Sequence, residues 1–180
     1  MPATLAEAVK ERLRVEDLKN LIEDVQQRWP DSPLLWLRDV AQHLNQALVT
    51  QPEAAGEVLG GEPLSALTAS MRKVITAMLQ RVEENMRETF FETCVANTAH
   101  ELAKGGGVAG WRCLTQLLAG LQPTAVTAHL PRYVELRNSY QNRPAVGLAI
   151  LWSVGQAGHR SLQSGIKGKW GEGWVLDDVQ

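Results

Sequence analysis

Three glycines near the middle of the chain have the spacing of a dinucleotide-binding loop, because Gly105, Gly107 and Gly110 satisfy the pattern G-x-G-x-x-G. Such a loop follows a β-strand, opens a helix whose N-terminus holds the pyrophosphate, and precedes a carboxylate by about 20 residues. Here the preceding segment has a helical pattern, and no acidic residue lies within four positions of 130. We therefore expect a hinge between two helices and no nucleotide site.

The other residues that could support catalysis or hold a metal lack the spacing that this chemistry needs. His100-Glu101 begins like the zinc-protease motif H-E-x-x-H, but the second histidine is replaced by Lys104, whose ammonium group cannot be a ligand. Cys94 and Cys113 lie in apolar helical patterns, which predicts reduced core residues in a cytosolic compartment. We predict no catalytic residue, no metal and no cofactor, and we expect that the chain is not an enzyme.

Basic and aromatic side chains near the C-terminus form a candidate interaction face. The segment from Thr124 onward has six basic and four acidic residues, so its formal charge is +2 and that of the remainder is −4. Such cations can bind an acidic protein, RNA or lipid headgroups, and exposed tryptophans can dock a partner. The alternative is that the cations are solvated on helix surfaces and that the tail folds back or is disordered. The candidate residues are Arg132, Arg137, Arg143, Arg160, Lys167, Lys169, Trp170 and Trp174.

The elements that must position these side chains all have helical periodicity. The clearest one begins at Ser32-Pro33, a helix-capping residue followed by proline at the first helical position. Apolar residues then recur every three or four positions, at Leu34, Leu37, Ala41, Leu44 and Leu48. Similar patterns predict helices over residues 4–13, 15–29, 64–82, 90–102, 111–121, 124–140 and 144–155, with a loop over 51–63. Pro131 should kink or split the helix that contains it.

The last predicted helix combines small and large apolar residues. Ala145, Gly147 and Ala149 suit a close approach of two helices, whereas Ile150, Leu151 and Val154 are expected to point inward. Arg143, which precedes the helix-starting proline, is expected to pair with a nearby acid or carbonyl group. The helix should end at Gly155 or Gly158, because glycine readily adopts the positive φ of a helix C-terminus.

These patterns predict an all-α fold, either an irregular, HEAT-like α-solenoid or a bundle of antiparallel helix hairpins. We expect a single all-α domain over residues 1–165 and a weakly ordered tail with glycines and tryptophans over 166–180. No apolar run approaches the roughly 18 uncharged residues of a membrane span, and the first residues lack a signal-peptide core. The sequence as it stands is typical of a soluble protein.

Two stretches resemble the N-terminal cytosolic region of the transmembrane protein 214 family. They are SPLLWLRDVAQHLN, residues 32–45, and YVELRNSYQNRPAVGLAILWSVGQAG, residues 133–158. The first stretch and the helices between the two resemble the family less closely than the block RPAVGLAILWSVGQAG does. The resemblance covers residues 5–165, and the tail from Lys167 onward departs from it.

The resemblance implies a helical scaffold or adaptor module of an animal endoplasmic reticulum membrane protein. Such a module would lie on the cytosolic face of the membrane and act by protein–protein interaction, with a procaspase as partner during stress-induced apoptosis. Its membrane spans would belong to segments absent from this chain. The resemblance implies no catalytic or cofactor-binding residues. The alternative function is a basic-faced module that binds RNA or anionic lipid headgroups, which a salt titration distinguishes.

Overall fold

The computed structural model describes residues 1–50 and 62–165, with side chains described as far as Gly158, and every regular element in these ranges is a helix. The all-α prediction is therefore confirmed. The elements are α1 (Leu5–Arg12), α2 (Val15–Arg28), α3 (Pro33–Ala47), the 3-10 helix η2 (Pro63–Ala66), α5 (Ala69–Gln80), α6 (Glu84–Lys104), α7 (Ala109–Leu121), α8 (Thr124–Thr127), α9 (Leu130–Ser139) and α10 (Pro144–Gly165).

The helix boundaries follow local signals in the sequence. Thr4 begins α1 with a capping box, in which its hydroxyl oxygen accepts a hydrogen bond from the Glu7 backbone at 3.2 Å. Gly105 ends α6 at φ 78°, in the left-handed region that favours glycine. Pro131 splits the segment from 124 to 140 into α8 and α9, as expected, because proline is tolerated in the first turn of α9.

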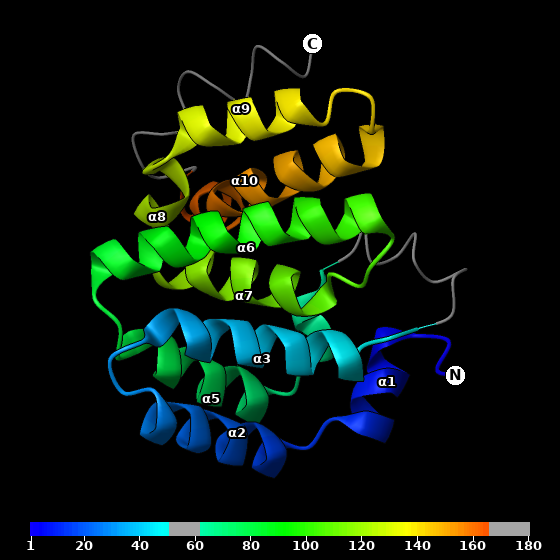
Figure 1. Ribbon diagram of the computed structural model, residues 1–180, viewed down its shortest axis with the longest axis vertical. Coiled ribbons are helices and arrows are strands. Elements are labelled where there is room, and N and C mark those ends of the chain that lie inside the picture. Colours follow the sequence, from blue (N-terminus) through cyan, green and yellow to red (C-terminus); the bar gives the residue numbers. More distant parts are fainter. Residues whose placement is uncertain (51–61, 166–180) are drawn as a thin grey trace.

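The helices stack in rows along the long axis of the molecule (Figure 1). Helices α2, α3 and α5 form one end, α6 and α7 the middle, and α9 and α10 the other end. Because α7 packs against α3, α5, α6, α8, α10 and η2, it is the centre of the stack. This arrangement is compatible with an irregular solenoid and with a bundle of helix hairpins.

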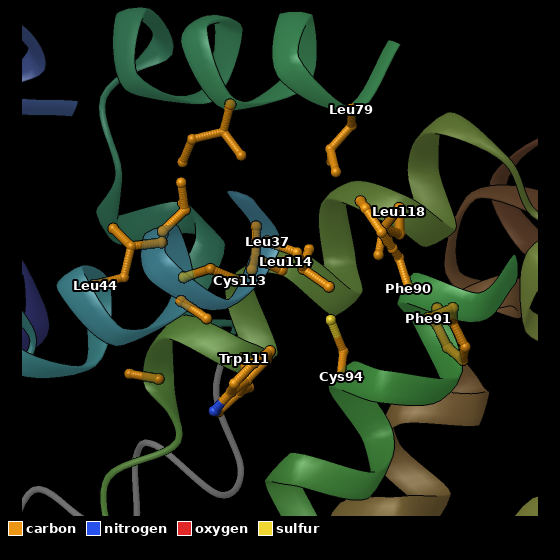
Figure 2. Packing of buried hydrophobic residues seen from close by; sticks show 14 of the residues in the cluster. Leu37, Leu44, Leu79, Phe90, Phe91, Cys94, Trp111, Cys113, Leu114 and Leu118 are labelled. Atoms are coloured by element: carbon orange, nitrogen blue, oxygen red, sulfur yellow. The ribbon is translucent and has the colours of Figure 1, made fainter. Parts of the chain in front are cut away.

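Helix α7 is buried on nearly all sides, and apolar side chains from its neighbours converge on it (Figure 2). Leu114 and Leu118 of α7 have no exposed surface, and the same holds for Leu37 of α3 and Phe90 of α6. Burial of this many apolar side chains is the main stabilising contribution, at about 25 cal/mol for each Å² removed from water. The described chain thus has a continuous core that holds its two ends in a fixed relation.

The structure corrects three expectations for α10. Leu151 is 52% exposed rather than inward, and the helix continues through Gly155 and Gly158 to Gly165. A Cβ atom at Gly147 would meet no heavy atom within 4 Å, so this glycine does not mediate close helix packing. The reason is the rotation of α10 about its own axis. The side of the helix that faces the core carries Val146, Ala149, Ile150 and Ser153, so Leu151 on the opposite side faces outward.

The apolar stripe of α3 is buried along most of its length. Leu37, Ala41 and Leu44 are fully buried, whereas Leu34 in the first turn is 41% exposed. The first turn of α3 comes directly after the exposed turn at Pro30. The predicted face of α3 is therefore confirmed except at its first member.

Candidate functional site

Three basic residues of the candidate interaction face have described side chains, and they lie on or beside the α9–α10 hairpin: Arg132, Arg137 and Arg143. Their contacts differ. Arg132 at the start of α9 forms an ion pair with Glu92 of α6, with 2.5 Å between Nη1 and Oε1. The hydrogen bond with Glu92 raises the pKa of Arg132. Arg132 thus helps to attach α9 to α6 and is already occupied by a carboxylate within the chain.

Two other arginines converge on one cleft of about 520 Å³. The cleft lies between the last turn of α9, which contributes Arg137, and the first turns of α10, which Arg143 immediately precedes. A guanidinium nitrogen of Arg143 donates a hydrogen bond to the backbone carbonyl of Ala103 in the last turn of α6. The expectation that Arg143 pairs with a nearby acid or carbonyl is therefore confirmed, and this contact restricts the direction of the side chain beside the cleft.

The apolar part of the cleft consists of two leucines that sequence reasoning did not select. Leu148 is 66% exposed and Leu151 is 52% exposed, and both line the cleft together with Gly147. No acidic residue is among the residues that line it. The sequence signal that could have identified them is the three-residue separation of Leu148 and Leu151. This separation places both leucines on the side of the helix opposite the buried Val146 and Ala149. The arrangement is an exposed apolar surface bordered by positive charge.

The remaining candidate residues cannot be assigned to this cleft. The side chain of Arg160 lies beyond the last described side chain, and Lys167, Lys169, Trp170 and Trp174 lie outside the described residues. The cleft thus contains Arg137 and Arg143, and the structure adds Leu148 and Leu151 to them.

The structure shows where the glycine loop and the His100-Glu101 motif lie. Gly105 ends one helix, and Gly110 lies inside the next, where its backbone N–H donates to the side-chain oxygen of Asn45 at 2.7 Å. The loop between them joins two helices, as expected, and the element directly before it is the helix α6 rather than the strand that a dinucleotide site needs. His100 and Lys104 lie in the last turns of α6. Among residues 1–50 and 62–165, the described side chains form no cluster of three His, Cys, Asp or Glu that could hold a metal.

The two cysteines are buried in the core, as predicted. Burial raises the pKa of the Cys113 thiol to about 12, and it also raises the pKa of Cys94. A thiol protonated in this way is a poor nucleophile, because the thiolate is the reactive form. Cys94 and Cys113 therefore have a packing role.

A second cleft, of about 340 Å³, lies between η2, α5, α7 and α10. The side-chain oxygen of Gln116 accepts a hydrogen bond from the Leu64 backbone N–H at 2.9 Å. The side-chain nitrogen of Gln116 donates to the Gln156 oxygen at 3.3 Å. These hydrogen bonds hold η2 and α10 against α7, so Gln116 and Gln156 have a structural role.

Comparison with known proteins identifies relatives over nearly the whole chain. Residues 1–172 match the family described as "TMEM214, C-terminal, caspase 4 activator". Transmembrane protein 214 of Homo sapiens is 33% identical over 169 residues, which cover 91% of this chain and 24% of the human protein. Transmembrane protein 214-A of Xenopus laevis is 30% identical over 167 residues, again 91% of this chain and 24% of the relative. No solved structure matches the chain.

The chain spans about a quarter of the length of these relatives. The family description names a C-terminal domain, whereas the resemblance in the sequence pointed to the N-terminal region. The match also extends into the tail as far as residue 172, beyond the limit expected from that resemblance. Within the part of the chain that the structure describes, no helix is both long and apolar enough to cross a bilayer. The match over residues 1–172 and the identity to the human protein agree, and the chain belongs to the transmembrane protein 214 family.

Proposed function

We propose that this chain is a helical adaptor module that contributes to caspase activation by binding a caspase precursor, and that it does so without catalysis of its own. Residues 1–165 act as one folded unit in this proposal. The family description supports the caspase part, since it reads "caspase 4 activator". The α9–α10 cleft supports the binding part, because an exposed apolar surface bordered by charge is typical of a protein interface.

The observation that carries the proposal is the exposure of Leu148 and Leu151 beside Arg137 and Arg143. Leucines exposed to this degree gain free energy when a partner covers them, at about 25 cal/mol per Å². Arginine is enriched at the centres of interfaces, where it combines apolar contact with hydrogen bonds. The α9–α10 hairpin is attached to α6 by the hydrogen bond from Arg143 to the Ala103 carbonyl and by the ion pair between Arg132 and Glu92.

The membrane location is part of the same proposal. The relatives are named transmembrane proteins, and this chain covers about a quarter of their length. We assign membrane attachment to parts of the longer relatives that this chain does not span, and we place this module on the cytosolic face of the endoplasmic reticulum. Protease added to intact endoplasmic reticulum vesicles should then cleave the module without detergent, whereas protection from protease would contradict the placement.

Binding between the purified chain and a catalytically inactive caspase 4 precursor tests the function. We expect saturable binding that weakens by less than about tenfold between low and moderate salt, since apolar contacts dominate. Binding to RNA or to anionic vesicles would instead fall by orders of magnitude with added salt, because it depends on counterion release. No binding to the precursor together with steep, salt-sensitive binding to RNA or vesicles would overturn the proposal.

Two double variants make this test specific for the site. Replacing both Leu148 and Leu151 by serine should abolish precursor binding and leave the melting temperature nearly unchanged, because both side chains are exposed. The matched control replaces Val134 and Leu130 by serine, since these apolar side chains of α9 are also exposed but do not line the cleft. Equal loss of binding in both double variants would contradict the choice of site.

A further inference from the structure

We infer that the α9–α10 cleft binds an acidic amphipathic helix, an inference that rests on the proposed protein-binding function and specifies the partner's chemistry. The partner element would present leucine-like side chains toward Leu148 and Leu151 and carboxylates toward Arg137 and Arg143. Each step of this inference follows from the charge, the shape and the apolar pattern of the cleft.

The charge of the hairpin selects an acidic partner. The segment from Leu130 to Gly165 has a formal charge of +3, with Glu135 as its single acidic residue. Because Arg132 is paired with Glu92, the charge at the cleft itself comes from Arg137 and Arg143. Glu135 does not line the cleft, and Arg137 forms no ion pair with any described residue. Carboxylates placed beside these guanidinium groups would form charge-assisted hydrogen bonds, which are among the stronger polar contacts in proteins.

The position of Arg143 favours binding, because its hydrogen bond to Ala103 restricts the side chain before a partner arrives. One guanidinium nitrogen of Arg143 donates a hydrogen bond to the Ala103 carbonyl. An arginine side chain has five N–H donors, so the others can hydrogen-bond to a partner. A side chain that is fixed in advance loses less conformational entropy on binding. Arg137 and Arg143 lie on either side of the turn between α9 and α10, so a short acidic segment can reach both.

The shape of the cleft selects a helix. Leu148 and Leu151 are three residues apart on α10 and form a short apolar ridge on its exposed face. Gly147 lies beside that ridge, and the space above its Cα is open, since a Cβ atom there would meet nothing within 4 Å. A ridge next to an open groove is the surface into which the side chains of a second helix pack.

Two synthetic peptides, each of about four helical turns, test the inference with the full chain. The acidic probe has leucines along one face and glutamates beside them, and the matched probe has lysines in place of the glutamates. Fluorescence anisotropy should show saturable binding of the acidic probe and at least about tenfold weaker binding of the lysine probe, because like charges repel. Equal affinity for both probes would overturn the inference.

Variants with matched controls locate the binding. Arg137→Glu should weaken binding of the acidic probe by about tenfold or more, whereas Lys73→Glu on the distant helix α5 should change it less than about twofold. Gly147→Leu should fill the groove and weaken binding by a similar factor, without loss of melting temperature. Its control is Gly155→Leu on the same helix, which is equally free of contacts but does not line the cleft. No effect of Arg137→Glu and Gly147→Leu would overturn the inference.

Other occupants would give different results. Concentration-dependent dimerisation that Gly147→Leu abolishes would identify a second copy of the chain. Probe binding that appears only after deletion of residues 166–180 would identify that segment as the occupant, and stronger binding to anionic phospholipid vesicles than to the acidic probe would identify a membrane surface. Each of these results would overturn the inference.

The two proposals can fail separately. If the caspase 4 precursor binds Arg137→Glu and Gly147→Leu as tightly as it binds the original chain, the adaptor function stands and this inference fails. If the acidic probe binds at the cleft and the precursor does not bind at all, this inference stands and the proposed partner is wrong.

Discussion

The guanidinium carbon of Arg112 lies 3.9 Å from the centre of the Trp152 ring, so a cation of α7 stacks on an aromatic face of α10. Arg112 has no exposed surface, and burial lowers its pKa to about 10. Burial of a charged group is costly unless neighbouring groups stabilise it, and an aromatic face does so electrostatically. This contact joins the central helix to the helix that carries the candidate site.

We expect Trp152→Ala to lower the free energy of unfolding by about 2–4 kcal/mol, because it removes both apolar contacts and the ring that faces Arg112. Trp152→Phe should cost less, since it keeps an aromatic face. Denaturant unfolding measures both values. Leu148→Ala on the exposed face of α10 is the control and should change stability by less than about 0.5 kcal/mol. Equal effects of Trp152→Ala and Leu148→Ala would show that the stacking contributes nothing.

Two glycines should respond oppositely to the same substitution. A Cβ atom at Gly110 would collide with the carbonyl oxygen of Ala41 and come within 2.9 Å of the Asn45 backbone nitrogen. Gly110→Ala should therefore force α3 and α7 apart and destabilise the chain by about 1–3 kcal/mol. Gly147→Ala has open space and replaces glycine inside a helix, so it should stabilise by about 0.5–1 kcal/mol. Thermal melts compare the two, and destabilisation by Gly147→Ala would contradict the open groove described for the cleft.

Much of the fold could be predicted because helix limits depend on neighbouring residues. Ser32-Pro33 predicts the start of α3, Pro131 predicts a break, and Gly105 predicts the end of α6. Ser32 occupies the N-cap position of α3 without a side-chain cap hydrogen bond, so the signal there comes from proline at the first helical position. Proline's missing backbone donor and glycine's positive φ likewise act locally and require no knowledge of tertiary contacts. The family resemblance could also be recognised, since two blocks of the sequence carry it.

The rotation of α10 and the composition of the site could not be predicted in the same way. Helix α10 is apolar around much of its circumference, so periodicity alone did not decide that Ile150 is buried and Leu151 exposed. The stacking of Arg112 on Trp152 joins residues 40 positions apart, so the residues that neighbour either one in the sequence do not predict it. The cleft likewise depends on how the turn after α9 places Arg137 beside Leu148.

The buried stripe of α3 gives a direct test of its face. Leu37 and Leu44 have no exposed surface, so we expect Leu37→Ala and Leu44→Ala each to destabilise by about 2–4 kcal/mol through lost burial and the cavity left behind. Gln42 is exposed on the other side of the helix and is the control, with an expected change of less than about 0.5 kcal/mol. If denaturant melts show Gln42→Ala to be as costly as Leu44→Ala, the assigned face is wrong.

The buried thiols should make the chain less stable in mild alkali. In the folded state, burial raises the pKa of Cys113 to about 12 and also raises that of Cys94, whereas an unfolded thiol titrates at about 8.5. Above about pH 8.5 the unfolded state therefore loses protons that the folded state keeps, and unfolding becomes more favourable as the pH rises. Each thiol should reduce the free energy of unfolding by about 1.5 kcal/mol between pH 8.5 and pH 10, since one pH unit corresponds to about 1.4 kcal/mol and the unfolded thiol is only half ionised at pH 8.5.

Urea unfolding at a series of pH values measures this slope, and the variant with both Cys94→Ala and Cys113→Ala is the control. The variant will be less stable at neutral pH because it loses packing, but its stability should fall much less steeply between pH 8.5 and pH 10. Measuring only up to pH 10 separates the effect of the thiols from that of Tyr133. Burial also raises the pKa of Tyr133, but an unfolded tyrosine titrates only at about pH 10. An identical slope in both proteins would show that the thiols are not the groups responsible for the alkaline loss of stability.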